Sequence, residues 1–327
     1  MSSSPAEPRI VLVGFGPTTR PALDSLLSRW QVTALVREED DEVAAHARRL
    51  GVAVERVGSP SRVASLVEQH APDCVVVSSY NRILSADVLD LCPFVNVHYS
   101  PLPRYRGRAN VNWAILNHET QAAVTVHSIV PGLDSGGVLA QACVPIGPRD
   151  TVGTLYARLN VLQGDILPDA VARRLGGDLG DPQDESEATY GCTRLPADGE
   201  IDWTATTADV DALVRALGPP YPDAFTYLGL EQVGVLEAQP SPGGKVFAGR
   251  VAGRVVEWSR SEGWSDVLTG DGVLRIQRVR VAGETRPAAA VLNSSRLSLG
   301  LRSSELIAEI AELRTRIATL TAERTQL

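Results

Sequence analysis

Short apolar runs alternate with amphipathic segments along the first part of the chain. After Thr18 or Thr19, either of which can cap a helix, leucines recur with helical spacing at Leu23, Leu26 and Leu27. Further helices are expected at residues 43–50, 61–70 and 84–91, and buried strands at 10–13, 32–36, 52–54, 74–77 and 94–97. Strands that alternate with helices are joined by right-handed crossovers, so the pattern predicts an α/β fold with a Rossmann-like parallel sheet.

The pattern changes after residue 97. Two more strands are expected at 124–129 and 138–146, and a long amphipathic helix follows from Thr151 to about residue 175. Residues 176–187 are rich in glycine and acidic residues, as linkers often are. From 224 to 281, short strands alternate with turns, which predicts a small β-barrel or sandwich. We expect a disordered leader (1–8), a first domain (9–185), a linker (186–205), a second domain (206–302) and a C-terminal helix (303–327).

The C-terminal helix carries a heptad pattern. Its apolar residues are spaced alternately by four and three, with Arg324 at one position of the series: Leu306, Ile310, Leu313, Ile317, Leu320 and Leu327. An isolated helix of this length is marginally stable in water. We therefore expect it to pair in a coiled coil and make the protein a homo-oligomer. Packing on its own domain, or on another protein, are the alternatives.

Charge and cysteine content restrict the possible partners. Asp and Glu outnumber Lys and Arg by 39 to 31, a net charge of −8, which argues against binding nucleic acid or anionic membranes but leaves room for a local basic patch. The four cysteines are far apart, so neither a zinc ribbon nor a redox pair is expected. No run approaches the roughly 18 apolar residues of a membrane span, and the first eight residues do not resemble a secretory signal. We expect a reduced, cytoplasmic protein without a metal site.

A glycine pair follows the first predicted strand. Gly14 and Gly16 begin like a dinucleotide-binding motif, but the third glycine of that motif is replaced by Thr19. A tight turn between strand and helix is therefore the better interpretation of this segment.

Three polar residues point to acyl chemistry. Asn96 and His98 are two positions apart at the end of a predicted strand, so their side chains point to the same side, at the sheet edge where open α/β folds bind ligands. Asp134 lies between glycines in a loop that joins two strands. Histidine can move a proton, an aspartate can orient it, and an asparagine can donate to an oxyanion. By spacing alone, a lone histidine after a strand is more often a capped or structural residue.

The segment 94–141 closely resembles the 10-formyltetrahydrofolate-dependent formyltransferases. Their signature is Asn-x-His-x-Ser-x-Leu-Pro, then an aromatic-Arg-Gly, then Gly-x-Asp-x-Gly. The matching residues here are Asn96, His98, Ser100, Leu102, Pro103, Tyr105, Arg106, Gly107, Asp134 and Gly136. Residues 201–203, 214–217 and 221–225 resemble the start of the family's OB-like C-terminal domain, so the resemblance covers residues 9–302.

The resemblance implies roles for individual residues. Asn96 would bind the formyl oxygen, His98 would accept a proton from the amine, and Asp134 would set the charge of His98. The folate would contact Ser79, Tyr80, Asn81, Arg82, Ile83, Leu84, Val130, Gly132 and Leu133. Residues near the acceptor would be Ser100, Arg106, Gly107, Asn112 and His127. Two of these have a second interpretation, since Arg106 could instead staple its loop and His127 could be a structural strand residue.

The acceptor is expected to be a primary amine of a small molecule. Residues 112–117 and 124–127 resemble the UDP-aminoarabinose type of enzyme, which favours a nucleotide-linked amino sugar. An amino-acid-like natural-product precursor fits the sequence almost as well. The alternatives are a methionyl-tRNA formyltransferase, which the net charge of −8 makes less attractive, a formyltetrahydrofolate hydrolase, and a non-catalytic binding protein. The hydrolases carry an N-terminal regulatory domain, for which there is no room ahead of Ile10.

Overall fold

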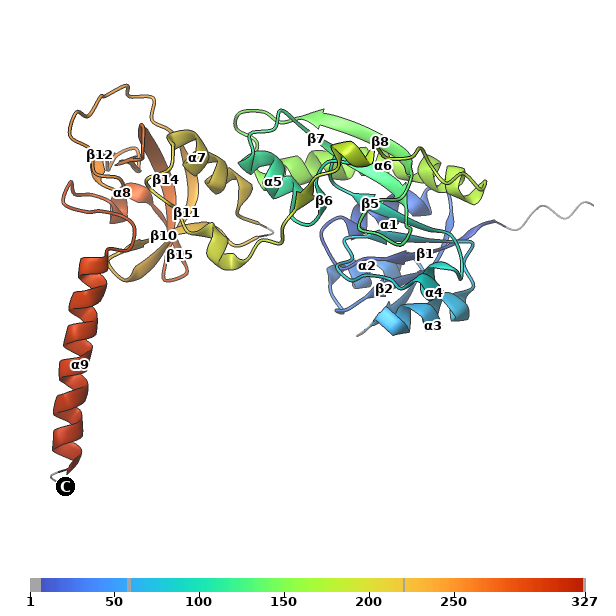
Figure 1. Ribbon diagram of the computed structural model, residues 1–327, viewed down its shortest axis with the longest axis horizontal. Coiled ribbons are helices and arrows are strands. Elements are labelled where there is room, and N and C mark those ends of the chain that lie inside the picture. The colour runs from blue at the N-terminus through green and yellow to red at the C-terminus, as the bar shows by residue number, and fades with distance from the viewer. Residues whose placement is uncertain (1–6, 58–59, 220, 326–327) are drawn as a thin grey trace, which may run out of the picture. The chain divides into compact units, whose positions relative to one another are not determined.

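The computed structural model describes residues 7–57, 60–219 and 221–325. Most of the predicted leader and the last heptad residue, Leu327, therefore lie outside the described residues. The chain divides into two compact units, Met1–Arg194 and Leu195–Leu327 (Figure 1). Within the described residues, no helix combines the length and the hydropathy needed to cross a bilayer.

The first unit is built on a seven-stranded sheet with the order β3-β2-β1-β4-β5-β7-β8. Five strands are parallel, as predicted: β1 (Arg9–Val13), β2 (Gln31–Arg37), β3 (Ala53–Arg56), β4 (Cys74–Ser78) and β5 (Phe94–His98). The two further strands, for which the sequence predicted no direction, are β7 (Gln121–Ser128) and β8 (Val138–Pro145), and they run antiparallel. The connection between β7 and β8 is a short loop, and only a longer crossover could have returned the chain in parallel.

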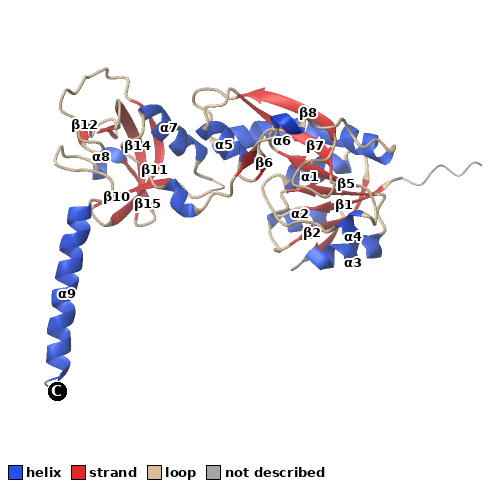
Figure 2. Ribbon diagram, in the orientation of Figure 1, coloured by secondary structure: helices blue, strands red, loops and turns tan. Residues whose placement is uncertain are grey.

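Helices cover both faces of this sheet (Figure 2). Val63, Leu66 and Val67 of α3 (Pro60–His70) pack with Val88 of α4 (Ala86–Leu89) in a hydrophobic cluster on one face. Helix α6 (Val152–Leu175), capped by the Thr151 side chain, packs against α1 (Thr19–Leu27) and several strands. The remaining helices of the unit are α2 (Glu42–Arg49) and α5 (Asn110–Leu116). The helix expected at 84–91 is only the single turn of α4.

A short strand pair lies apart from the large sheet. β6 (Arg106–Gly107), in the loop after β5, pairs in parallel with β9 (Tyr190–Gly191). A 3-10 helix, η1 (Glu185–Glu187), lies just before β9. The segment that the sequence predicted as a linker is therefore hydrogen-bonded to the loop that follows Asn96 and His98.

The second unit is mostly an antiparallel sheet. Its strands are β10 (Ala224–Leu228), β11 (Glu231–Pro240), β12 (Val255–Ser259), β13 (Trp264–Leu268), β14 (Val273–Val281) and β15 (Glu284–Pro287). Helix α7 (Thr207–Ala216) packs Val210 and Val214 on the apolar face of the sheet, and Trp203 donates from Nε1 to Thr226 Oγ1 at 2.9 Å. The unit also contains the short elements η2 (Pro196–Gly199) and α8 (Ala288–Val291).

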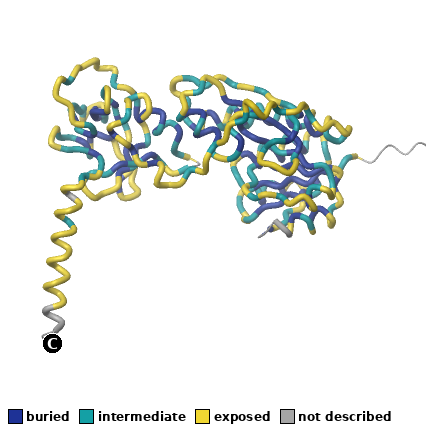
Figure 3. Tube along the Cα trace, in the orientation of Figure 1, coloured by how far each residue is buried: buried dark blue, intermediate teal, exposed yellow. Residues whose placement is uncertain are grey.

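The predicted C-terminal helix is present as α9 (Ser303–Thr325). Its heptad residues within the described part of the chain are exposed, from 36% for Leu306 to 63% for Ile317 and Leu320. Figure 3 shows exposure along almost the whole of this helix. In the single chain, the seam is thus open to solvent rather than packed on the second unit.

Candidate active site

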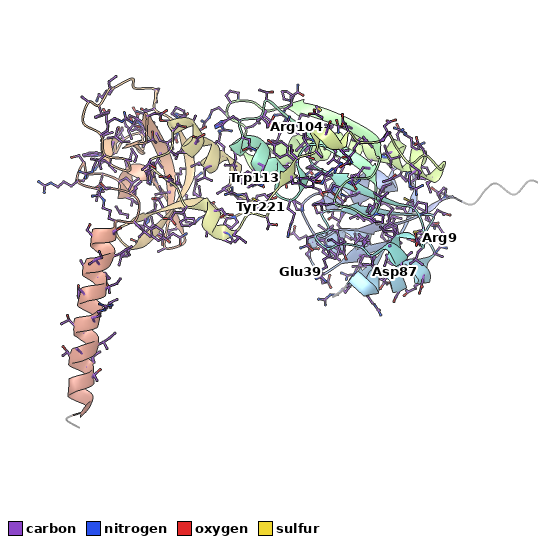
Figure 4. All side chains as sticks on the ribbon, in the orientation of Figure 1. Arg9, Glu39, Asp87, Arg104, Trp113 and Tyr221 are labelled. Atoms are coloured by element: carbon purple, nitrogen blue, oxygen red, sulfur yellow. The ribbon has the colours of Figure 1, made fainter. Side chains whose placement is uncertain are left out.

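The site lies where the parallel part of the sheet meets the antiparallel part. Asn96 and His98 come from β5, and His127 comes from the neighbouring β7, directly opposite Asn96 in the register. Asp134 lies in the loop between β7 and β8. Arg104, labelled in Figure 4, lies in the loop after β5, and Trp113 lies on α5, the helix that follows this loop. The structure thus brings together the three residues that the sequence singled out, and adds His127 to them.

The Asp134 carboxylate is at the centre of this cluster. Its Oδ2 is 3.5 Å from His98 Nδ1, and its Oδ1 is 3.6 Å from His127 Nε2. Asn96 Nδ2 donates to Oδ1 at 3.4 Å, and the Gly107 backbone N–H donates to Oδ2 at 2.9 Å. Burial alone would raise the pKa of Asp134, but the two histidines and the Gly107 N–H outweigh it and lower the pKa to about 2. Asp134 is therefore ionised at neutral pH.

His98 is buried, and both of its ring nitrogens have polar neighbours. Nδ1 faces Asp134, whereas Nε2 lies 2.9 Å from the Tyr105 carbonyl oxygen and 2.9 Å from Asn110 Nδ2. Burial lowers the pKa of His98, and the nearby Asp134 and the Tyr105 carbonyl only partly oppose this shift. The site thus holds a neutral imidazole beside a carboxylate, an arrangement that can accept a proton and stabilise the resulting cation.

His127 has its tautomer set by the backbone. Its Nδ1 lies 2.9 Å from the Ser128 carbonyl oxygen, which can only accept, so the neutral ring carries its proton there. Nε2 then accepts from Asn96 Nδ2 at 3.1 Å. This hydrogen bond orients the Asn96 amide. His127 is therefore part of the cluster, where it contacts Asn96.

The other predicted acceptor residues are mostly engaged within the protein. The buried Arg106 guanidinium binds Glu185, Gln183 and Tyr190, which favours the loop-staple interpretation over the substrate-anchor one. Ser100 Oγ donates to the Arg104 carbonyl oxygen at 2.9 Å, and Asn112 is buried on α5. The Gly107 backbone N–H donates to the Asp134 carboxylate.

The predicted folate segments lie at the carboxyl edge of the sheet. Residues 79–84 connect β4 to α4, and Tyr80, Leu84 and Ile129 all pack against the hydrophobic cluster on one face of the sheet. Three apolar side chains on these segments are exposed, Ile83, Val130 and Leu133. Arg82 forms an ion pair with Glu38, and Ser79 and Gly132 have positive φ. Exposed apolar side chains can cover a flat heteroaromatic ring, and backbone polar groups beside them can hydrogen-bond to its edge.

Two residues of the site were missed by sequence reasoning. Asn110 contacts His98, and Gln183 donates to the backbone of the Asp134 loop. Gln183 falls in the glycine-rich acidic stretch, where no periodic pattern distinguishes one polar residue from another. Among the described residues, no cluster of His, Cys, Asp and Glu is arranged to hold a metal ion.

The sequence matches the models of two known protein families. Residues 29–171 match the model of the formyl transferase family, and residues 195–296 match the model of the formyl transferase C-terminal domain.

Solved structures with a similar fold carry related descriptions. HypX from Aquifex aeolicus, in complex with tetrahydrofolic acid, matches with a TM-score of 0.66 and 20% identity over 88% of this chain and 47% of its own. The present chain thus spans about half the length of HypX. WlaRD, a sugar 3N-formyl transferase, matches with a TM-score of 0.62 and 16% identity over 86% of this chain and 100% of its own. A 4-N formyltransferase from Francisella tularensis matches with a TM-score of 0.56 and 16% identity over 67% of this chain and 91% of its own. At these identities the likeness is one of fold, but together the two family matches leave only the chain's ends and a short connection uncovered, and the chain therefore belongs to the formyl transferase family.

Proposed function

We propose that this protein transfers a formyl group from 10-formyltetrahydrofolate to a primary amine of a small molecule. The observation that carries the proposal is the convergence of Asn96, His98 and Asp134, with Asp134 within 3.5 Å of both other side chains. Structures of similar fold were solved with folates, since HypX was crystallised with tetrahydrofolic acid and WlaRD in the presence of dTDP and 5-N-formyl-THF.

The proposed reaction has two stages. The amine lone pair attacks the formyl carbon, and the carbonyl electron pair moves to the oxygen. This oxygen accepts a hydrogen bond from the Asn96 amide N–H that otherwise points to Asp134 Oδ1 at 3.4 Å. A single donor aimed at such an oxyanion is worth about 3 kcal/mol. His98 takes the proton from the amine, and Asp134 stabilises the imidazolium. The bond from the formyl carbon to N10 then breaks with its electron pair moving to N10, which takes the proton from His98. The products are the formamide and tetrahydrofolate.

Residues 79–84 and 130–134 form the proposed folate slot next to Asn96, His98 and Asp134. Ile83, Val130 and Leu133 offer apolar surface, and the backbone around Ser79, Asn81 and Gly132 offers donors and acceptors for a pterin-like ring. The formyl group would then project from this slot toward Asn96.

A nucleotide-linked amino sugar is the acceptor that we favour, with an amino-acid-like natural-product precursor as the second choice. The resemblance of residues 112–117 and 124–127 to the amino-sugar enzymes supports this choice. WlaRD, described as a sugar 3N-formyl transferase, and the Francisella protein, described as a 4-N formyltransferase, share the fold. A methionyl-tRNA acceptor and a hydrolase that transfers the formyl group to water are the alternatives.

Release of tetrahydrofolate distinguishes these reactions. The full-length protein would be given 10-formyltetrahydrofolate with single amines from a panel of aminosugar nucleotides, ornithine, hydroxyornithine, free amino acids and methionyl-tRNA, and with no amine. Release that depends on one amine supports the transferase and identifies its acceptor class. Release without any amine indicates the hydrolase. Folate binding without release for every amine would contradict the proposed activity and favour a binding protein.

We further propose that the protein is a homodimer held by a parallel coiled coil of α9. Ile310 and Ile317 occupy the a positions of the heptads, and Leu306, Leu313 and Leu320 occupy the d positions. This distribution favours two parallel strands. In that arrangement Glu309 at g faces Arg314 at e of the partner helix, so each dimer gains two attractive charge pairs. The exposure of the seam in the single chain supports this proposal.

The second unit is proposed to be an OB-like barrel. Bridges from Leu299 to Leu228 of β10, and from Ser298 to Arg254 next to β12, support closure between the two end strands of the sheet. Cytoplasmic location remains a prediction.

A further inference from the structure

A segment that the sequence predicted as a linker is bound to the loop of the active site. We call residues 183–190 the strap. The Arg106 backbone N–H donates to the Thr189 carbonyl oxygen at 2.8 Å, and the Tyr105 N–H donates to Thr189 Oγ1 at 2.9 Å. Together with the β6–β9 pair, these bonds fix the strap against the loop that follows His98.

Arg106 holds the strap by its side chain. Its guanidinium forms a two-bond ion pair with Glu185, at 2.8 and 2.6 Å, and its Nε and Nη2 donate to Gln183 Oε1 at 3.2 and 2.8 Å. The fifth donor points to the Tyr190 hydroxyl at 3.4 Å. The Arg106 side chain is only 2% exposed. All its donors are thus engaged within the protein.

Gln183 links Arg106 to the Asp134 loop by hydrogen bonds. With its oxygen held by Arg106, the Gln183 amide nitrogen donates to the carbonyl oxygens of Asp134 and Gly136, each at 2.7 Å. All the hydrogen-bonding capacity of the amide is used. Asp134 itself has a φ of 49°, a conformation in which a non-glycine residue needs support from its surroundings.

The position of Asp134 has little tolerance. Its carboxylate oxygens lie 3.4 Å from Asn96 Nδ2 and 3.5 Å from His98 Nδ1, which is already longer than a well-formed hydrogen bond. An outward displacement of the loop would therefore weaken the contact with Asn96 further and reduce the attraction between the carboxylate and His98. The Gly107 N–H, next to Arg106, holds the carboxylate at 2.9 Å, so the same segment restrains both the side chain and the backbone of Asp134.

We infer that Gln183 is a positioning residue for Asp134, and that the Arg106–Glu185 pair sets Gln183 in place. The strap thus acts on the reaction through the backbone of the Asp134 loop. This inference rests on the proposed function, because the role of Asp134 in formyl transfer is assigned there.

Gln183→Met in the full-length protein is the test, since it removes both ends of the amide at similar size. We expect kcat to fall about ten- to a hundredfold while the KM for 10-formyltetrahydrofolate changes less than about twofold, as expected for a small misplacement of a catalytic group. Because methionine leaves two donors of the buried Arg106 without an acceptor, the Tm should also fall, and kcat is therefore measured per folded molecule. In Gln183→Glu, the acceptor for Arg106 is kept but the two donors are lost, and kcat should fall as far.

Gln163→Met is the matched control. Gln163 is a fully buried glutamine on α6. Its amide nitrogen donates to the Thr18 carbonyl oxygen at 3.1 Å and its Oε1 accepts from the Tyr99 hydroxyl at 2.9 Å, so both ends of the amide are used, as in Gln183, but on partners outside the Asp134 loop. This variant should lower the Tm and leave kcat per folded molecule unchanged. A Gln183→Met variant that behaves in the same way would reduce the strap to a structural staple.

The titration of His98, followed by NMR, gives a readout that does not depend on turnover. His98 faces Asp134, the Tyr105 carbonyl, the Asn110 amide and His127. Asp134 raises the pKa of His98, so its displacement in Gln183→Met should move the titration to lower pH. An unchanged titration would overturn the inference, even if the wild-type protein released no tetrahydrofolate. The absence of amine-dependent release by the wild type alone would contradict only the proposed function.

Discussion

At the scale of single residues, His98 is subject to opposing influences. Burial favours its neutral form, whereas the ionised Asp134 and the Tyr105 carbonyl favour its cation. A base for an amine must be neutral before the attack and charged after it, so an environment that accommodates both states suits the proposed chemistry.

Replacing His98 with Asn removes the base and keeps a polar side chain. We expect the kcat of His98→Asn to fall by about 10² to 10⁴, the usual contribution of a general base. Because the proposed folate slot involves other residues, the Kd for 10-formyltetrahydrofolate should stay within about threefold. The rate of tetrahydrofolate release gives kcat, and equilibrium binding gives the Kd. Near-normal turnover would contradict the proposed role.

The pH dependence of the reaction follows from the same residue. The pKa of His98 lies below its ordinary value of about 6.5, and the ring must be neutral to act as a base. We therefore expect kcat/KM, measured with an acceptor amine whose own titration has been corrected for, to lose activity only as the pH falls below about 6.5. Asp134, with a pKa of about 2, adds no second step in the range of pH 4 to 8. An acid limb centred above pH 7 would contradict this assignment.

At the scale of elements, the loop between β7 and β8 depends on the close approach of two backbones. A Cβ on Gly136 would lie 1.8 Å from the Ser128 carbonyl oxygen, whereas a Cβ on Gly164, inside α6, would meet no atom within 4 Å. This contrast offers a matched pair of substitutions with opposite expected signs.

Gly136→Ala should displace the Asp134 loop, because the Ser128 backbone cannot retreat from β7. We expect a lower Tm together with a loss of activity greater than tenfold. Gly164→Ala should stabilise the protein by about 0.5–1 kcal/mol, the gain of alanine over glycine within a helix, with unchanged activity. Thermal unfolding and the tetrahydrofolate assay test both. Equal effects of the two substitutions would show that the close contact is not a constraint.

The sequence predicted the elements better than it predicted their connections. Buried apolar runs placed β1, β2, β4 and β5 within one or two residues, because a strand buried on both faces has few alternatives. The antiparallel direction of β7 and β8 was not predicted, since strand direction depends on pairing and not on local pattern. The strap was missed for a similar reason: Gln183 becomes part of the site through contacts with Asp134, Gly136 and Arg106, which lie 49, 47 and 77 positions earlier in the chain.

At the scale of the whole molecule, assembly should depend on α9 and chemistry should not. The full-length protein should sediment as a dimer, and deletion of residues 303–327 should give a monomer with unchanged kcat per site. Ile310→Glu combined with Ile317→Glu, which keeps the full length, should act as the deletion does, because a charge at a buried a position opposes pairing. A full-length monomer at micromolar concentration would contradict the coiled coil.

The strap also has a consequence for exchanging parts between relatives. The match to the first family model ends at residue 171 and that to the C-terminal domain begins at 195, so the strap belongs to neither. A chimera joined at the end of the first match would pair Arg106 of one parent with a foreign strap. A junction between Arg194 and Leu195, where the two compact units divide, keeps Arg106, Gln183 and Glu185 from a single parent. Chimeras of relatives are thus expected to be active when joined at Arg194–Leu195 and to lose activity when joined at residue 171.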